Sequence, residues 1–152
     1  MSEDRQLYAE DLHEGFSFVG SEKALTVDLF KGFAELTGDR HPIHYDAAYA
    51  GKTRFGRPVA HGLLLMAMTA VGATELSARL EAAMVALVSQ RSEFLKPAFV
   101  GDRLRTSYEV LSNAVTKSGT TARVELMVRV ANAQGDTLLE GRHVYLLRCR
   151  PA

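Results

Sequence analysis

The chain has little cysteine and no excess of either charge. Its single cysteine, Cys149, cannot form an internal disulfide or supply a thiolate zinc cage, so the sequence predicts a protein of a reducing compartment. The 18 Lys and Arg residues balance the 18 Asp and Glu residues. Because there is neither a basic excess nor a basic run, nucleic acid and anionic membrane surfaces are not expected partners.

Long hydrophobic runs are also missing. The first six residues contain one apolar residue, Met1, and lack the apolar stretch of a signal peptide. The longest apolar stretch, 62–73, is shorter than the roughly 20 residues that a membrane-spanning helix needs. These absences predict a cytoplasmic protein with no membrane segment. At 152 residues and 47% hydrophobic composition, the chain is expected to form one domain over 1–152.

The first half of the chain carries helical patterns. Over 26–36 the apolar residues are spaced by three and four, which predicts an amphipathic helix with Thr26 as its cap and Gly38 as its end. A second short helix is expected from Asp46 over 47–52. The pattern over 62–80 predicts one long helix that is apolar on nearly all sides for its first three turns, and protein is expected to surround such a helix on most sides.

The hydrophobic period changes to two in the second half. Residues 121–130 alternate apolar and polar side chains, as in a half-buried antiparallel strand. Further strands are expected over 84–95, 104–115 and 138–148, and a short one near 16–19. Helices followed by strands indicate an α+β fold, in which a curved antiparallel sheet wraps around the long central helix. Pairing two subunits edge to edge would cover one free edge of this sheet.

The segment 33–62 differs from the rest because it holds three of the five histidines. Asp39 and His44 flank a turn at Pro42, and an Asp and a His that share one water can move its protons during attack on an activated alkene. Spacing alone, however, favours a structural interpretation, in which Asp39 caps the loop and His44 is a turn histidine with satisfied hydrogen bonds.

Gly62 lies where the long helix is expected to begin. Backbone N–H groups at such a position could stabilise an oxyanion, and a glycine would let a carbonyl group approach closely, although a plain helix-start glycine is the simpler interpretation. The Asp39, His41, His44 and His61 spacings match no known cage, so no metal is expected. Motifs for a bound dinucleotide or for a serine or cysteine nucleophile are also missing from the sequence.

Three segments together resemble a known family. The stretch Phe33-Ala-Glu-Leu-Thr-Gly-Asp-Arg-His-Pro-Ile-His-Tyr-Asp46 is similar to the hydratase-2 motif of MaoC-like dehydratases, the R-specific enoyl-CoA hydratases. Two later stretches also fit: Tyr49-Ala-Gly-Lys-Thr-Arg-Phe-Gly-Arg-Pro-Val-Ala-His-Gly-Leu-Leu64 and Phe94-Leu-Lys-Pro-Ala-Phe-Val-Gly-Asp102. The resemblance spans most of the chain and implies a single MaoC-like hotdog domain.

The resemblance also implies an activity. The chain would interconvert trans-2-enoyl-CoA and (R)-3-hydroxyacyl-CoA, as a homodimer or a larger assembly of dimers, with no cofactor other than the coenzyme A of its substrate. Asp39 and His44 would hold the catalytic water, and the Gly62 N–H would bind the thioester oxygen. The expected substrate-binding residues are His41, Pro42, His61 and Leu63. His41 departs from the family, which usually has Asn there, and this bears on the substrate more than on the chemistry.

Two other functions remain open. A hotdog thioesterase would share the fold and the coenzyme A ligand but would hydrolyse the thioester bond, and a non-catalytic acyl-CoA-binding subunit would bind without turnover. Thioesterases lack the Asp/His turn motif, and an intact Asp39–His44 pair argues against a non-catalytic subunit. Release of free thiol would identify the first, and binding without turnover would identify the second.

Overall fold

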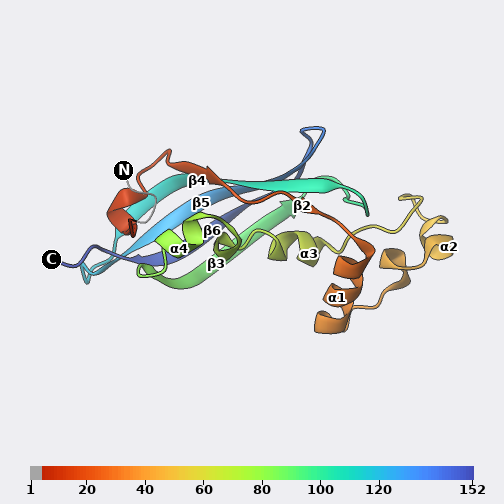
Figure 1. Ribbon diagram of the computed structural model, residues 1–152, viewed down its shortest axis with the longest axis horizontal. Helices are drawn as coiled ribbons and strands as arrows, with labels where there is room; N and C mark the ends of the chain where they lie inside the picture. The colour runs from red at the N-terminus through yellow and green to blue at the C-terminus, as the bar shows by residue number, and fades with distance from the viewer. Residues whose placement is uncertain (1–4) are drawn as a thin grey trace.

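The computed structural model describes residues 5–152. As the sequence predicts, the helices lie in the first half of the chain and the long strands in the second half (Figure 1). Short 3-10 turns are η1 (Ala9–Asp11), η2 (Pro42–His44) and η3 (Val71–Ala73). The helices are α1 (Val27–Thr37), α2 (Ala47–Ala50), α3 (Gly62–Ala67) and α4 (Leu76–Arg79). The strands are β1 (Ser17–Val19), β2 (Lys23–Ala24), β3 (Met84–Phe94), β4 (Arg103–Val115), β5 (Thr121–Asn132) and β6 (Thr137–Arg148).

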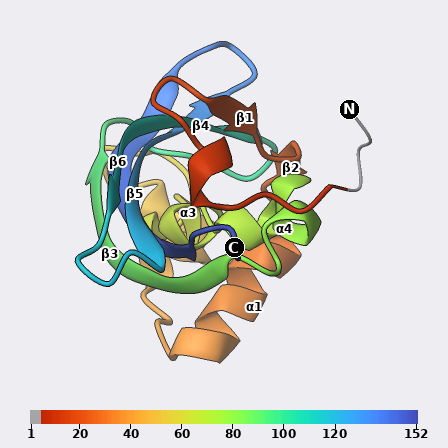
Figure 2. The same cartoon turned by 90° about the vertical axis from the view of Figure 1, so that its left-hand side faces the viewer.

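The strands form one antiparallel sheet in the order β1-β4-β5-β6-β3, with β2 also paired to β4. The sheet curves around the segment that contains α3 and α4 (Figure 2). A curved antiparallel sheet around a central helical segment is the hotdog fold, so the α+β prediction is confirmed. The helices α1 and α2 lie at one end of the molecule, away from the C-terminus (Figure 1).

The period-two pattern of β5 is the reason that the sheet has one dry face. Its apolar set is buried and its polar set faces outward, which follows from the opposite directions of successive side chains on a strand. The buried members are at most 3% exposed and are Ala122, Val124, Leu126, Val128 and Val130. They pack against the helical segment and so position α3 relative to the sheet.

Local signals set the ends of α1 as predicted. The Thr26 hydroxyl accepts a hydrogen bond from the Leu29 amide at 3.2 Å, and Gly38 ends the helix in the left-handed conformation with φ of 79°. The second predicted helix is also present, with Asp46 as its cap, but α2 ends at Ala50 instead of Lys52. Both helices lead into the histidine-rich segment and hold its ends.

The prediction of one long helix over 62–80 is wrong. The segment is divided into α3, η3 and α4, because Ala70 is extended at φ −63° and ψ 124°. Two hydrogen bonds replace the helical ones at the break: the Thr69 hydroxyl donates to the Met66 carbonyl at 2.6 Å, and the Tyr108 hydroxyl donates to the Thr69 carbonyl at 3.0 Å. Leu63 is an exception to the predicted burial of this segment on most sides, since its side chain is 58% exposed.

The strand β3 ends the sheet and is poorly covered. It pairs with β6 along one edge only, and its apolar side chains Val85, Leu87 and Val88 are each more than 40% exposed. Between residues 5 and 152, no helix is long and apolar enough to cross a membrane.

Candidate active site

The loop between α1 and α2 is held by hydrogen bonds from its own side chains. The Asp39 carboxylate accepts from the His41 amide at 3.2 Å, and His41 Nδ1 accepts from the Ile43 amide at 3.3 Å. Pro42 occupies the first position of η2, where a missing N–H costs no hydrogen bond. These contacts place Asp39 before the turn and His44 at its end.

The side chain of His44 is oriented by backbone. Its Nδ1 lies 2.7 Å from the Val59 carbonyl oxygen. Because a carbonyl can only accept, Nδ1 carries the hydrogen of this bond, and the neutral ring keeps its lone pair on Nε2. His44 therefore has one nitrogen fixed to the protein and one nitrogen able to accept a proton.

His61 is buried directly against His44. The two ring centroids are 3.7 Å apart with an angle of 23° between the planes, and His61 is 2% exposed. The pKa of His61 is lowered, first by burial and then by the proximity of His44. The ring is therefore kept neutral, since either a charged His61 or a charged pair of stacked rings would be costly.

Tyr45 connects His61 to the loop. Its hydroxyl lies 2.7 Å from His61 Nε2 and donates to the Asp39 carbonyl oxygen at 3.0 Å. Burial raises the pKa of Tyr45, and the Asp39 charge raises it further. Because the Tyr45 hydroxyl donates its hydrogen to the Asp39 carbonyl, it accepts a hydrogen bond from His61 Nε2–H. The buried Nδ1 of His61 then has no hydrogen-bond partner among residues 5–152.

The three acid–base groups converge. A carboxylate oxygen of Asp39 and one nitrogen each of His44 and His61 lie within 4.8 Å of one another. Two hydrogen bonds of ordinary length through one water span up to about 5.6 Å, so a single water could bridge Asp39 and His44.

The same three residues are those that could hold a metal ion. The stacked rings fit this poorly, because their nitrogen lone pairs lie in two nearly parallel planes, with ring centroids 3.7 Å apart, and so do not converge on one nearby ion. The Nδ1 of His44 and the Nε2 of His61 are already hydrogen-bonded within the protein. The arrangement suits proton transfer better than metal binding.

Gly62 opens α3 beside these groups. Its amide has no hydrogen-bond acceptor within the described part of the chain, as expected for the first residue of a helix. A Cβ at this position would lie 3.1 Å from Cε1 of Phe94, which is tighter than ordinary packing. The glycine therefore lets both Phe94 and any ligand come close to the free N–H.

His44 and Gly62 face one pocket of about 350 Å³, which is open to solvent. Its wall also includes Ile43, Val59, Leu65 and Phe94. This largely apolar wall, which also carries Arg54, Lys96, one histidine and one free amide, suits a small acyl group with a polar end. The other predicted site residues do not line this pocket: Asp39, His41, Pro42, His61 and Leu63.

Each of these residues has a definite place. Asp39 and His61 lie within the acid–base cluster, whereas His41 is exposed and caps η2 through its own ring nitrogen. Leu63 projects outward. The hydrogen bond that His41 makes to the Ile43 amide is of the loop-tying kind expected from the Asn that the family usually has.

Two groups that contribute to the site were not predicted from the sequence. Tyr45 was recognised only as part of the motif, although its place directly after His44 signals a contact with the same site. The Val59 carbonyl carries no sequence signal, since any residue could supply it. Only the tertiary structure brings it to His44, 15 residues earlier.

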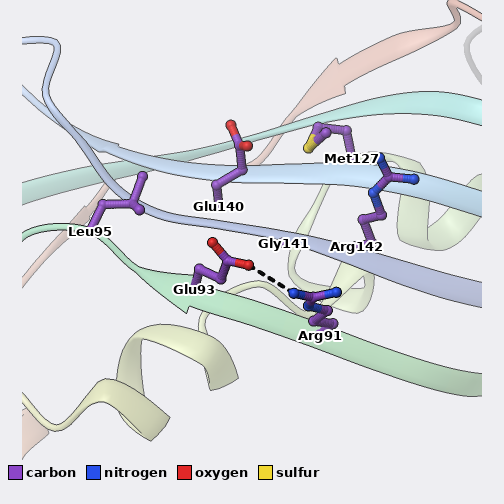
Figure 3. A pocket seen from close by; sticks show the side chains of 7 residues that line it. All are labelled: Arg91, Glu93, Leu95, Met127, Glu140, Gly141 and Arg142. Carbon is purple, nitrogen blue, oxygen red and sulfur yellow. Dashed lines mark hydrogen bonds and ion pairs between the residues drawn. The ribbon is translucent and has the colours of Figure 1, made fainter.

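A second hollow, of about 280 Å³, lies on the outer face of the sheet and contains none of the predicted residues (Figure 3). Its charged side chains are paired: Arg91 with Glu93, Glu140 with Arg129, and Arg142 with Glu125. A hollow whose charges are already neutralised offers less to a ligand than the His44 pocket does.

Comparison with known proteins identifies the family of the chain. Residues 17–132 match the family model described as "MaoC like domain". A 3-hydroxybutyryl-CoA dehydratase of Methylorubrum extorquens is 36% identical over 72% of this chain and 68% of its own length. An (R)-specific enoyl-CoA hydratase of Aeromonas caviae is 36% identical over 51% of this chain, and the match spans only 56% of that relative.

A solved structure supports the same relationship. The unliganded R-hydratase of Pseudomonas aeruginosa superimposes with a TM-score of 0.75 at 25% identity, over 97% of this chain and 92% of that one. Since the family model covers most of the chain and includes the whole Asp39–Gly62 segment, this protein belongs to the MaoC-like domain family.

Proposed function

We propose that this chain is a hydratase that interconverts trans-2-enoyl-CoA and (R)-3-hydroxyacyl-CoA. The names of two relatives support the reaction class, since one is a 3-hydroxybutyryl-CoA dehydratase and the other an (R)-specific enoyl-CoA hydratase. The observation that carries the proposal is the orientation of His44. Its Nδ1 is held by Val59, and its Nε2 has no hydrogen-bond partner among residues 5–152. It shares a pocket with the Gly62 amide, which also lacks a partner there, while a carboxylate oxygen of Asp39 lies nearby.

The mechanism follows from these positions. The thioester carbonyl accepts a hydrogen bond from the Gly62 amide, which draws electron density from the double bond. Asp39 takes one proton from a water that His44 orients, and the water oxygen forms a bond to the β-carbon. The electron pair of the double bond moves to the thioester as an enolate. The Asp39–His44 pair then delivers a proton to the α-carbon, and the enolate collapses to the product.

The proposal requires no metal and no redox cofactor. The proton that Asp39 takes from water is the one delivered to the α-carbon of the product. Asp39, His44 and the Gly62 amide are therefore sufficient for the proton balance. Treatment with a chelator is expected to leave activity unchanged, whereas loss that zinc or magnesium restores would contradict this part. The cytoplasmic location and the single-domain extent stay predictions of the sequence.

The test is hydration of crotonyl-CoA, followed by loss of the enoyl thioester absorbance. Asp39→Asn and His44→Ala are each expected to lower kcat by about 10²-fold or more, with circular dichroism unchanged. His13→Ala is the matched control, since His13 is exposed and lies outside the loop. Turnover with free thiol would indicate a thioesterase, and acyl-CoA binding without turnover would indicate a non-catalytic subunit.

The free edge of β3 supports a homodimer. An 11-residue edge strand with exposed Val85, Leu87 and Val88 would be a site of aggregation if it were left uncovered. Pairing β3 with its copy would cover it and would place Phe94 and Leu95, which line the pocket, next to the interface. Light scattering should give the mass of a dimer or of a multiple of dimers for the wild type and a shift toward monomer for Leu87→Lys. A monomeric wild-type protein would contradict this part.

A further inference from the structure

Positive charge gathers on the loop between α2 and α3. Lys52, Arg54 and Arg57 are exposed, and the loop 51–58 contains no acidic residue. Across the described residues 5–152, none of the three makes an ion pair, whereas Lys96, which also lines the His44 pocket, is paired with Asp136. These cations are therefore available to an anionic ligand.

Aromatic rings hold the two arginines in place. The guanidinium carbon of Arg54 lies 4.8 Å from the ring centroid of Phe55, and that of Arg57 lies 4.1 Å from the ring centroid of Phe99. Stacking restricts the side chains while the N–H groups at the edge of each guanidinium stay free. A planar guanidinium that is oriented in advance is well suited to bind phosphate through two hydrogen bonds.

The cations lie beside the candidate active site. Arg54 and Phe55 are part of the same pocket wall as His44 and Gly62, and Arg54 is exposed, so it forms part of the pocket rim. The loop is fixed there because Val59 pairs with Phe99 and the Ala60 amide donates to the Ala98 carbonyl. A thioester that reacts at His44 can therefore extend the rest of its carrier past these side chains.

We propose that Arg54, assisted by Lys52 and Arg57, binds the phosphate groups at the nucleotide end of coenzyme A. This inference rests on the proposed function. Coenzyme A carries a diphosphate and a separate ribose phosphate, which gives three phosphate groups for three cations. A carrier protein presents only one phosphate beside its pantetheine arm. The loop thus favours coenzyme A thioesters over those of an acyl carrier protein.

Carriers of increasing length separate the contributions of the individual phosphate groups to binding. Hydration of crotonyl-pantetheine, crotonyl-phosphopantetheine and crotonyl-CoA is measured with the wild type, Arg54→Gln and Arg123→Gln. Arg123 is the matched control, because it is exposed on β5 near the β4–β5 turn, at the end of the sheet far from α2 (Figure 1). Arg54→Gln is expected to raise KM for crotonyl-CoA about tenfold. It should leave kcat within about twofold and the KM for crotonyl-pantetheine unchanged, and Arg123→Gln should match the wild type throughout.

Several results would overturn the inference while the hydratase function stands. One is an equal wild-type KM for crotonyl-pantetheine and crotonyl-CoA. Another is an Arg54→Gln effect already complete with crotonyl-phosphopantetheine, which would assign the cations to the phosphate common to both kinds of carrier. A third is an Arg54→Gln variant that turns over crotonyl-CoA normally but a crotonyl-acyl carrier protein poorly. That result would mean that the loop binds an acidic protein surface.

Calorimetry with adenosine 3′,5′-bisphosphate tests the cations without catalysis. Binding to the wild type that is about tenfold weaker in Arg54→Gln supports the inference, even if no thioester is turned over and the proposed function fails. Equal binding by the two proteins, or no binding to either, overturns it.

Discussion

The rings of His44 and His61 are stacked, with their centroids 3.7 Å apart, and this contact joins the loop after α1 to the start of α3. His61 is buried, so it forms a rigid surface against which His44 is held, while the Val59 carbonyl sets the rotation of the His44 ring. The pair explains how His44, which we propose to be catalytic, keeps a definite orientation on an exposed loop. It also makes the site sensitive to residues that no substrate touches.

Tyr45→Phe is expected to weaken this arrangement. The substitution removes the hydroxyl between His61 Nε2 and the Asp39 carbonyl and leaves a buried polar nitrogen poorly satisfied, which typically costs about 1–3 kcal/mol. Urea unfolding should show this loss, together with a lower kcat for crotonyl-CoA. Tyr49→Phe serves as the control, because Tyr49 is exposed. If Tyr45→Phe matches the wild type in both stability and kcat, the Tyr45 hydroxyl does not support the site.

Gly62→Ala is expected to damage activity in two separable ways. The new Cβ would meet Phe94 Cε1 at 3.1 Å, and it would also obstruct a thioester carbonyl at the Gly62 amide. Adding Phe94→Leu should relieve the packing conflict and restore the melting temperature. It should not restore kcat/KM, which we expect to stay at least about tenfold below that of Phe94→Leu alone. Recovery of both quantities would mean that the glycine serves packing only.

Stability should fall as the solution becomes acidic. Burial is the first cause that lowers the pKa of both His61 and His143 below the usual value of 6.5. The unfolded chain therefore takes up these protons before the folded chain does. The stabilisation is complete above about pH 6.5 and is lost as pH falls through the lowered folded pKa values.

Substitution of His143 tests how much of this pH dependence of stability comes from that residue. His143 lies between the Thr69 and Tyr145 hydroxyls in the core, so His143→Gln should lower stability at pH 8 and flatten its decline between about pH 6.5 and 5. Urea unfolding across this range measures both effects, with His13→Gln as an exposed control. An unchanged slope in His143→Gln would exclude His143 as a source of the acid sensitivity.

Gly141→Ala should disrupt the pairing of β3 with β6. An added Cβ would lie 2.2 Å from the Arg91 carbonyl oxygen, and backbone cannot move aside as a flexible side chain could. We expect a loss of a few kcal/mol in unfolding free energy, comparable to other overpacking substitutions of about 1–3 kcal/mol or more. Gly72→Ala is the matched control, because nothing lies within 4 Å of the Cβ it would add. Equal stability of the two variants would contradict the close approach.

The sequence by itself determined the features that depend on neighbouring residues. The Thr26 and Gly38 signals act within one turn of α1 and predicted its boundaries, and the alternation in β5 predicted its buried face. The motif from Asp39 to His44 was recognised by its resemblance to a family, and its loop is held by hydrogen bonds between residues two apart in the chain.

Only the tertiary structure decided the rest, because the decisive contacts join residues distant in the chain. Helical periodicity over 62–80 is real, yet the Tyr108 hydroxyl, 39 residues beyond Thr69, takes a carbonyl that the helix would otherwise use. In the same way His61 reaches His44, and the Val59 carbonyl orients it, through the packing of α3 under the sheet. A periodic pattern predicts which face of a helix is apolar. It does not predict which distant polar group will hydrogen-bond to the backbone, and here such a bond, from Tyr108 to the Thr69 carbonyl, lies at the break in the helix.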